Sequence, residues 1–164
     1  MPRMKPDVLE EFLRQPHVGV IATLRSDGRP YTVPVWWLWK EGVIWVTGTF
    51  PRVWCKHLMH DPRVSLCIEA SAPVTGHVGI DGIAEAMKLP GFDIWPISRE
   101  LAEKYVGRGD PANAERVESF FANMRTEPRL LFRITPQVVR AIDMRVYRGK
   151  RADRDFQESG DPQA

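Results

Sequence analysis

Cysteine is scarce in this chain. Its 164 residues include only Cys55 and Cys67, which lie twelve positions apart and form no Cys-x-x-Cys pair. That pattern excludes a zinc ribbon and a disulfide-stapled scaffold. The sequence also has no run near the roughly 20 apolar residues of a membrane-spanning helix, and its first residues do not have the basic flank and apolar stretch of a signal peptide. We therefore expect a cytoplasmic protein that does not interact with membranes.

An excess of one charge is lacking as well. The chain has 23 Lys and Arg residues against 21 Asp and Glu residues, and both signs are interspersed. Proteins that bind nucleic acid depend on clustered basic side chains, which contact the phosphates. The charge pattern therefore predicts no nucleic-acid partner.

The length and the 43% hydrophobic content predict one domain with a real core. We place this domain at residues 1–144, with a helical insertion at about 90–128. Residues 145–164 are dominated by charge and are expected to form a tail.

Short β-branched runs separated by turn residues indicate a mainly β fold. We expect a meander of three strands at 17–24, 31–39 and 43–47, because Ser-Asp-Gly-Arg and Lys-Glu-Gly form tight turns between them. Further strands are predicted at 64–69, 78–87, 130–134 and 138–142, with a bulge or bend at Gly79 or Gly82. Helical spacing and proline positions predict helices at 6–15 and 51–59, and two more between 97 and 124. The prediction is an antiparallel barrel of about six to seven strands with peripheral helices.

Tryptophan is concentrated on two adjacent predicted strands, at positions 36, 37, 39 and 45. Strand alternation sends Trp37 and Trp39 to one face and Trp36 to the other. Two interpretations remain open. These rings belong to the core and an ordinary dimer contact, or they form a wall for a planar ligand.

A possible phosphate site follows the third strand. Thr47 and Thr49 end that strand, and Arg52 and Lys56 accompany the start of the next helix. Backbone amides at a helix start, hydroxyl groups and cations all favour an anion. The alternative is an ordinary helix start with solvated cations.

Metal and nucleophile motifs are weak in comparison. His57 and His60 lie three positions apart on a predicted helix, with Cys55 and Asp61 close in the sequence. No His-Glu-x-x-His motif exists, however, and a third ligand would have to come from elsewhere in the chain. No Gly-x-Ser-x-Gly elbow is present. We therefore expect no metal site and assign no catalytic side chain.

The segment from Val18 to Ile68 resembles the flavin-binding split-barrel family related to pyridoxamine 5′-phosphate oxidase. The resemblance rests on GVIATLRSDGRPYTVPVWWLW, on the following strand that ends in Thr, and on KHLMHDPRVSL. It implies a homodimer that holds FMN, or the deazaflavin coenzyme F-420, in a groove between subunits. Position by position, it places the flavin ring against Val33, Pro34, Val35 and Trp36, and the phosphate on Thr47, Thr49 and Lys56. The family pattern Lys-x-Arg-Asn-Leu reads WCKHL here, at residues 54–58, so one cation is missing, and Arg52 is the expected replacement.

The resemblance implies a flavin-dependent oxidoreductase that transfers hydride between FMN and a small organic substrate. A coenzyme F-420-dependent reductase is the second choice. An alternative of another class is a non-enzymatic carrier that binds a flavin or haem in the same aromatic groove.

Overall fold

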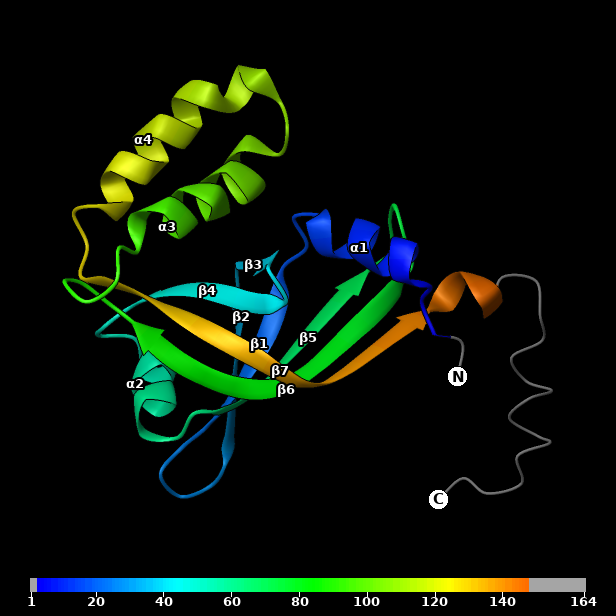
Figure 1. Cartoon of the computed structure of the whole chain (residues 1–164), viewed down its shortest axis with the longest axis horizontal. Helices are drawn as coiled ribbons and strands as arrows, with labels where there is room; N and C mark the ends of the chain where they lie inside the picture. The colour runs from blue at the N-terminus through cyan, green and yellow to red at the C-terminus, as the bar shows by residue number, and fades with distance from the viewer. Residues whose placement is uncertain (1–2, 148–164) are drawn as a thin grey trace.

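A computed structural model describes residues 3–147 of the chain. Most of the expected tail lies outside this range, and residues 145–147 belong to a short helix, η3 (Met144–Tyr147). The strands are β1 (Gly19–Leu24), β2 (Pro30–Val35), β3 (Trp37–Lys40), β4 (Val43–Thr49), β5 (Arg63–Ala70), β6 (Gly76–Met87) and β7 (Arg129–Asp143). The helices are α1 (Pro6–Arg14), α2 (Val53–His60), α3 (Trp95–Ala102), η1 (Glu103–Gly107), η2 (Pro111–Asn113) and α4 (Ala114–Met124). The expectation of a mainly β fold with peripheral helices is confirmed (Figure 1).

All seven strands form one antiparallel sheet in the order β2-β1-β5-β6-β7-β4-β3. The consecutive strands β2 and β3 lie at opposite edges of this sheet, yet only Trp36 separates them. Two Cα–Cα steps span at most about 7.6 Å, so the sheet must curl until its edges meet at Trp36. This closure gives a split barrel.

The curled sheet corrects the predicted meander. The single strand expected at 31–39 is wrong, because it is interrupted at Trp36: the first half pairs with β1 and the second half with β4. The separate strands expected at 130–134 and 138–142 are also wrong, because β7 is continuous. A register shift between Asp81 and Gly82 of β6 lets Pro136 fit opposite Gly82. A Cβ on Gly82 would lie 2.6 Å from the carbonyl oxygen of Thr135, so this position has no room for a side chain.

The insertion contains the two expected helices, which stand together beside the sheet in Figure 1. Ile97 and Leu101 of α3 join the main core, whereas Val117 and Met124 of α4 form a smaller cluster with Ala102. The segment between α3 and α4 continues as the π-helical turn η1. The insertion is therefore packed onto the barrel through α3.

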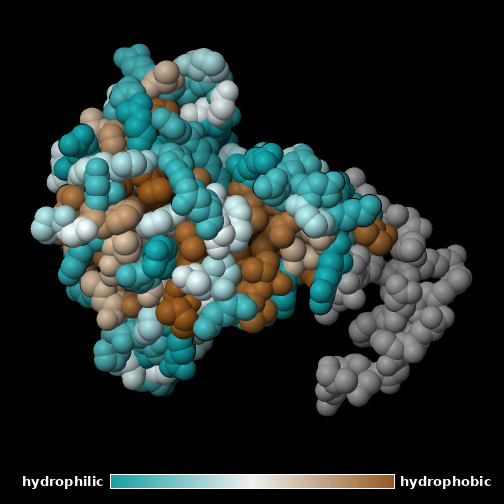
Figure 2. All heavy atoms as spheres, viewed as in Figure 1, coloured by the Kyte–Doolittle hydropathy of each residue, from teal (hydrophilic) through white to brown (hydrophobic). Residues whose placement is uncertain are grey.

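Three tryptophan side chains at β3 and β4 pack against other parts of the same chain. Trp37 and Trp45 are buried in the core, and Trp36 packs against Tyr105 and Phe120 of the insertion. The insertion therefore covers part of the Trp36 ring within the same chain. Apolar surface does remain over the sheet between the helix pair and α1 (Figure 2).

Candidate functional site

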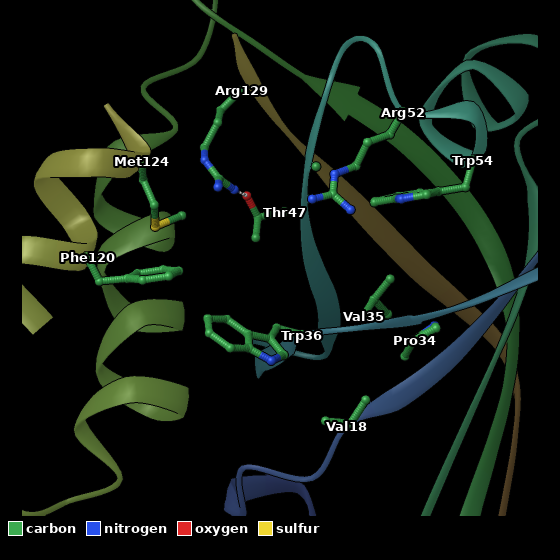
Figure 3. Close-up of a pocket in the computed structure, with 11 residues that line it drawn as sticks. Val18, Pro34, Val35, Trp36, Thr47, Arg52, Trp54, Phe120, Met124 and Arg129 are labelled. Carbon is green, nitrogen blue, oxygen red and sulfur yellow. Dashed lines mark hydrogen bonds between the residues drawn. The ribbon is translucent and has the colours of Figure 1, made fainter. Parts of the chain in front are cut away.

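A cavity of about 390 Å³ opens where β2 and β3 meet, between α2 and α4. We call it the junction cavity. Figure 3 shows Phe120 and Met124 of α4 on one side of the cavity. Trp54 of α2 and Arg52, the residue before α2, lie on the other side. Its lining residues are Val18, Pro34, Val35, Trp36, Thr47, Gly48, Arg52, Trp54, Phe120, Met124 and Arg129.

One end of the junction cavity is aromatic and rigid. The ring of Trp36 stacks on Tyr105 with a centroid distance of 4.8 Å and an interplanar angle of 2°, and the Phe120 ring is 5.4 Å away. The Tyr105 hydroxyl accepts a hydrogen bond from the backbone N–H of Trp37 at 3.2 Å and donates to the His17 carbonyl at 2.8 Å. Because Tyr105 is fixed by these bonds, it holds Trp36 in place as a flat wall.

The other end of the cavity is cationic. The Arg129 guanidinium donates to the Thr47 hydroxyl at 3.1 Å and to the Glu127 carboxylate, so much of its charge is balanced. Arg52 is exposed and makes no side-chain hydrogen bond or ion pair within residues 3–147. Arg52 is therefore the cation at this cavity that is available to an anionic ligand.

The local backbone explains why Arg52 lies here. Arg52 is the N-cap of α2 in an extended conformation, and its carbonyl accepts the N–H groups of Cys55 and Lys56. Helix α2 approaches β4 very closely, since a Cβ on Gly48 would lie 2.4 Å from the Cys55 sulfur. The small residue in β4 thus allows the start of α2 to form a wall of the cavity.

Trp54 replaces the basic residue that the family pattern places on this helix. Its side chain is 3% exposed, and its six-membered ring rests above Gly48. The buried indole N–H has no hydrogen-bond partner within residues 3–147, and neither has Nε of Arg129. Two buried donors therefore border this cavity without an acceptor, which is uncommon in folded proteins.

The structure brings together five of the eight residues expected to bind a cofactor, namely Pro34, Val35, Trp36, Thr47 and Arg52. The remaining three do not line the junction cavity. Val33 packs against the core, and Thr49 follows Thr47 at the end of β4, where it pairs with Arg129. Lys56 lines a different cavity of about 440 Å³, together with Arg25, Asp27, His57 and His60. Arg52 and Lys56 thus do not meet at one cavity of this chain.

Six lining residues were missed from the sequence: Val18, Gly48, Trp54, Phe120, Met124 and Arg129. Phe120 and Met124 lie on one of the two helices that the sequence predicts between 97 and 124. Their spacing of four residues gave a signal for one face, but not for the surface that this face meets.

The cysteine and histidine side chains do not form a reactive cluster. Burial raises the pKa of the Cys55 thiol to about 12, so the thiol stays neutral and is a poor nucleophile. Nδ1 of His57 lies 3.0 Å from the Thr23 hydroxyl. Within residues 3–147, no three His, Cys, Asp or Glu side chains gather closely enough to hold a metal ion. No helix in that range is long and apolar enough to span a membrane.

Comparison with known proteins places this geometry in a family. No curated protein matches the sequence. A conserved hypothetical protein from Mycobacterium tuberculosis has a similar structure, with a TM-score of 0.67, 23% identity and 85% of each chain covered. An F420 reductase gives a TM-score of 0.59 at 20% identity over 79% of this chain and 94% of its own. The haem storage protein of Vibrio cholerae gives 0.62 at 17% identity over 84% of this chain and 93% of its own.

Those identities show a shared fold. The family model described as pyridoxamine 5′-phosphate oxidase matches residues 6–143, which extend from the first helix to the end of β7. The chain therefore belongs to the pyridoxamine 5′-phosphate oxidase family.

Proposed function

We propose that this protein is a flavin-dependent oxidoreductase that binds FMN in the junction cavity. The observation that carries this proposal is the difference between the two ends of the cavity: one is aromatic, at Trp36 and Phe120, and the other is cationic, at Arg52. FMN matches this arrangement, because it has a planar ring at one end and a phosphate at the other. Membership of the family supports the same cofactor class.

The apolar end of the cavity fits the ring system. Trp36 is held flat by Tyr105, and Pro34 and Val35 border it from β2. A preorganised aromatic wall binds a planar ligand without the cost of ordering side chains. These residues would bind and orient the ring and exclude water from it.

The polar end fits the phosphate. The unpartnered Arg52 guanidinium would supply the charge, and the Thr47 hydroxyl would supply a hydrogen bond beside Arg129. Lys56 lies at the other cavity, so Arg52 takes the role that the resemblance gave to Lys56.

A bound flavin would supply the hydride chemistry, with reduction of one partner and oxidation of the other. The lining of the junction cavity contains no Asp, Glu or His side chain. The contribution of this chain is therefore to bind, orient and desolvate, and we assign no general acid or base.

Two alternatives share the same cavity. Coenzyme F-420 also joins a planar ring to a phosphate, so it remains the second choice. A haem carrier is less well supported, because Met124 is the only lining residue of a type that commonly ligates haem iron.

A pair of charge variants tests the phosphate contact. Arg52→Gln should weaken FMN binding by about tenfold to a hundredfold, since a charge-assisted hydrogen bond contributes roughly 1.5–3 kcal/mol. Lys56→Gln, four residues away and also exposed, should change it by less than about threefold. Riboflavin has no phosphate, so neither substitution should alter its affinity. Equal effects of the two substitutions on FMN would contradict the assignment of Arg52.

Turnover separates an enzyme from a carrier. With FMN bound, NADPH oxidation coupled to reduction of menadione should proceed over many cycles. The same assay with reduced coenzyme F-420 distinguishes the deazaflavin alternative. Tight FMN binding without turnover in either assay would favour the carrier.

A further inference from the structure

Another cavity, distinct from the junction cavity and from the cavity at Lys56, lies between η1 and α4 and is open to solvent. We call it the insertion cavity. Its volume is about 990 Å³. Its lining residues are Trp36, Tyr105, Val106, Arg108, Ala112, Asn113, Glu115, Arg116, Ser119, Phe120 and Asn123. Trp36 and Phe120 also line the junction cavity, so this aromatic pair borders both spaces.

The floor of the insertion cavity is aromatic. Tyr105 is buried and stacked on Trp36, and Phe120 tilts against Trp36 at 41°. The hydrogen bonds of the Tyr105 hydroxyl to backbone groups of His17 and Trp37 prevent this floor from shifting. Aromatic rings that are held in fixed positions at a cavity favour an aromatic ligand, which they contact by stacking or edge to face.

The rim of the insertion cavity carries two arginines without ion pairs in residues 3–147. Nε of Arg108 donates to the Tyr105 carbonyl at 3.2 Å, and Nη1 of Arg116 donates to Oδ1 of Asn113 at 3.1 Å. In both guanidinium groups, other N–H donors remain available. Glu115 is the one acidic side chain of the lining, so the cavity has a net positive charge.

The backbone beneath Arg108 is unusual. Arg108 has a φ of 52°, in the left-handed region that side chains other than Gly, Asn and Asp seldom adopt, and it caps the π-helical turn η1. Residues in such conformations and π-helical turns occur preferentially at functional sites. Here the conformation holds Arg108 at the edge of the aromatic floor.

We propose that the insertion cavity binds a planar aromatic molecule that carries a carboxylate. The aromatic part lies on Trp36, Tyr105 and Phe120, and the carboxylate lies between Arg108 and Arg116. The identification of this molecule as the substrate rests on the proposed flavin function, because the Trp36–Phe120 pair separates it from the cofactor cavity. The binding of this molecule to the insertion cavity does not depend on the proposed flavin function.

The test uses 2-naphthoate as the probe and 2-naphthylmethanol as its neutral counterpart, on the full-length chain without cofactor. Binding is followed through the tryptophan indole N–H resonances, with Trp36→Phe identifying the Trp36 signal. We expect 2-naphthoate to shift the Trp36 signal and to bind at least about tenfold more tightly than the alcohol, which corresponds to one charge-assisted contact.

Variants then locate the carboxylate. Arg108→Gln combined with Arg116→Gln should remove the preference for 2-naphthoate and leave binding of the alcohol unchanged. Arg14→Gln combined with Arg29→Gln removes the same charge from exposed sites on α1 and the β1–β2 turn, and should preserve the preference. Equal binding of both probes to the unmodified chain, binding of neither, or an equal effect of the two double variants would overturn the proposal.

The cofactor provides a separate readout. The Arg108, Arg116 double variant should bind FMN as the unmodified chain does, since neither residue lines the junction cavity. If FMN does not bind the unmodified chain, the proposed function fails, whereas the 2-naphthoate result still decides the insertion cavity.

Discussion

Tyr105 connects the helical insertion to the point where the sheet closes. Its hydroxyl is buried and bonded to backbone atoms of His17 and Trp37, and its ring supports Trp36. Burial raises the pKa of Tyr105 above its usual value, so the hydroxyl remains a proton donor throughout the physiological range. A single residue of the insertion thus fixes both the junction and the cavity wall.

Replacement of this hydroxyl is expected to destabilise the fold. In Tyr105→Phe the backbone N–H of Trp37 would lose its acceptor, which should lower the free energy of unfolding by about 1–3 kcal/mol. Tyr31→Phe is the matched control, because the Tyr31 ring contacts His57 and Arg25 but its hydroxyl makes no hydrogen bond within the described residues. Urea denaturation should show a loss for Tyr105→Phe alone. Equal stability of the two variants would contradict the role of the hydroxyl.

Lys104 should make stability depend on pH. Burial lowers its pKa to about 7, although Nζ donates to the Leu13 carbonyl and lies 3.6 Å from the centre of the Trp37 ring. Between pH 7 and about 10.4 the unfolded chain binds the extra proton at Lys104, so the contribution of Lys104 to the free energy of unfolding should rise with pH across this window. The slope should stay below about 1.4 kcal/mol per pH unit. The penalty is complete below pH 7, where both states carry the proton.

The variant Lys104→Met should remove this pH dependence, because it keeps an apolar stem and has no titrating group. The nearby His17 does not complicate the measurement, since burial and Lys104 lower its pKa below 6.5. Urea midpoints measured from pH 7 to 8.5 would decide the matter, because the raised pKa of Cys55 makes the free energy of unfolding fall as the pH rises above about 8.5. A slope that is unchanged in Lys104→Met would rule out Lys104 as its source.

At the scale of elements, the contact between α2 and β4 controls the polar end of the junction cavity. A Cβ on Gly48 would lie 2.4 Å from the Cys55 sulfur and 2.9 Å from the Trp54 ring. Gly48→Ala should therefore push α2 outward and lower stability by about 1–3 kcal/mol. Gly79→Ala is the control on β6, where the nearest atom to the new Cβ would be 3.9 Å away. Thermal unfolding should show a clearly larger loss for Gly48→Ala, and similar melting temperatures would contradict the close contact.

Local sequence patterns predicted most helices and strands, but they did not predict the break at Trp36 or the continuity of β7 through Pro136. Alternation runs unbroken through Trp36, so the sequence predicts one strand where closure of the sheet makes two. Conversely, Pro136 predicts a break in β7, and the bulge opposite it at Gly82 removes the need for one. Both outcomes depend on pairing between distant strands, which local patterns do not describe.

The candidate site shows the same difference between residues that local patterns predict and residues that pairing of distant strands brings in. Thr47 and Arg52 were predicted because a strand end and a helix start place them by local geometry, whereas Trp36 was placed at the site by the family resemblance. Arg129 lies 82 positions from the Thr47 hydroxyl to which it donates, and pairing of β4 with β7 joins the two. Lys56 and Arg52 were both expected at the phosphate because they accompany a predicted helix start, but Arg52 is an extended N-cap residue outside the helix. The spacing of four residues therefore does not place them on one face.

The whole molecule has an uncovered apolar strip beside the junction cavity. Val18 is 50% exposed and Val20 44%, and Val20 pairs with the exposed Pro34 and Cys67 on either side. We propose that a second copy of the chain covers this strip, which would give a homodimer with the cavity near its interface.

Light scattering tests this assembly. The unmodified chain should have twice the monomer mass, and Val20→Lys should shift it toward the monomer. Val53→Lys is the control, since Val53 is 51% exposed on α2 and outside the strip. A monomer for the unmodified chain, or dissociation by both substitutions, would contradict the proposed interface.

Titration of the purified chain with FMN, followed by flavin fluorescence, tests the proposed site most directly. Binding beside Trp36 should quench the flavin emission with a sharp end point at one FMN per chain. Trp36→Leu should bind FMN with much less quenching, because the stacked indole is gone. Flavin emission that stays at its free value when the chain is in excess would contradict binding of FMN in the junction cavity.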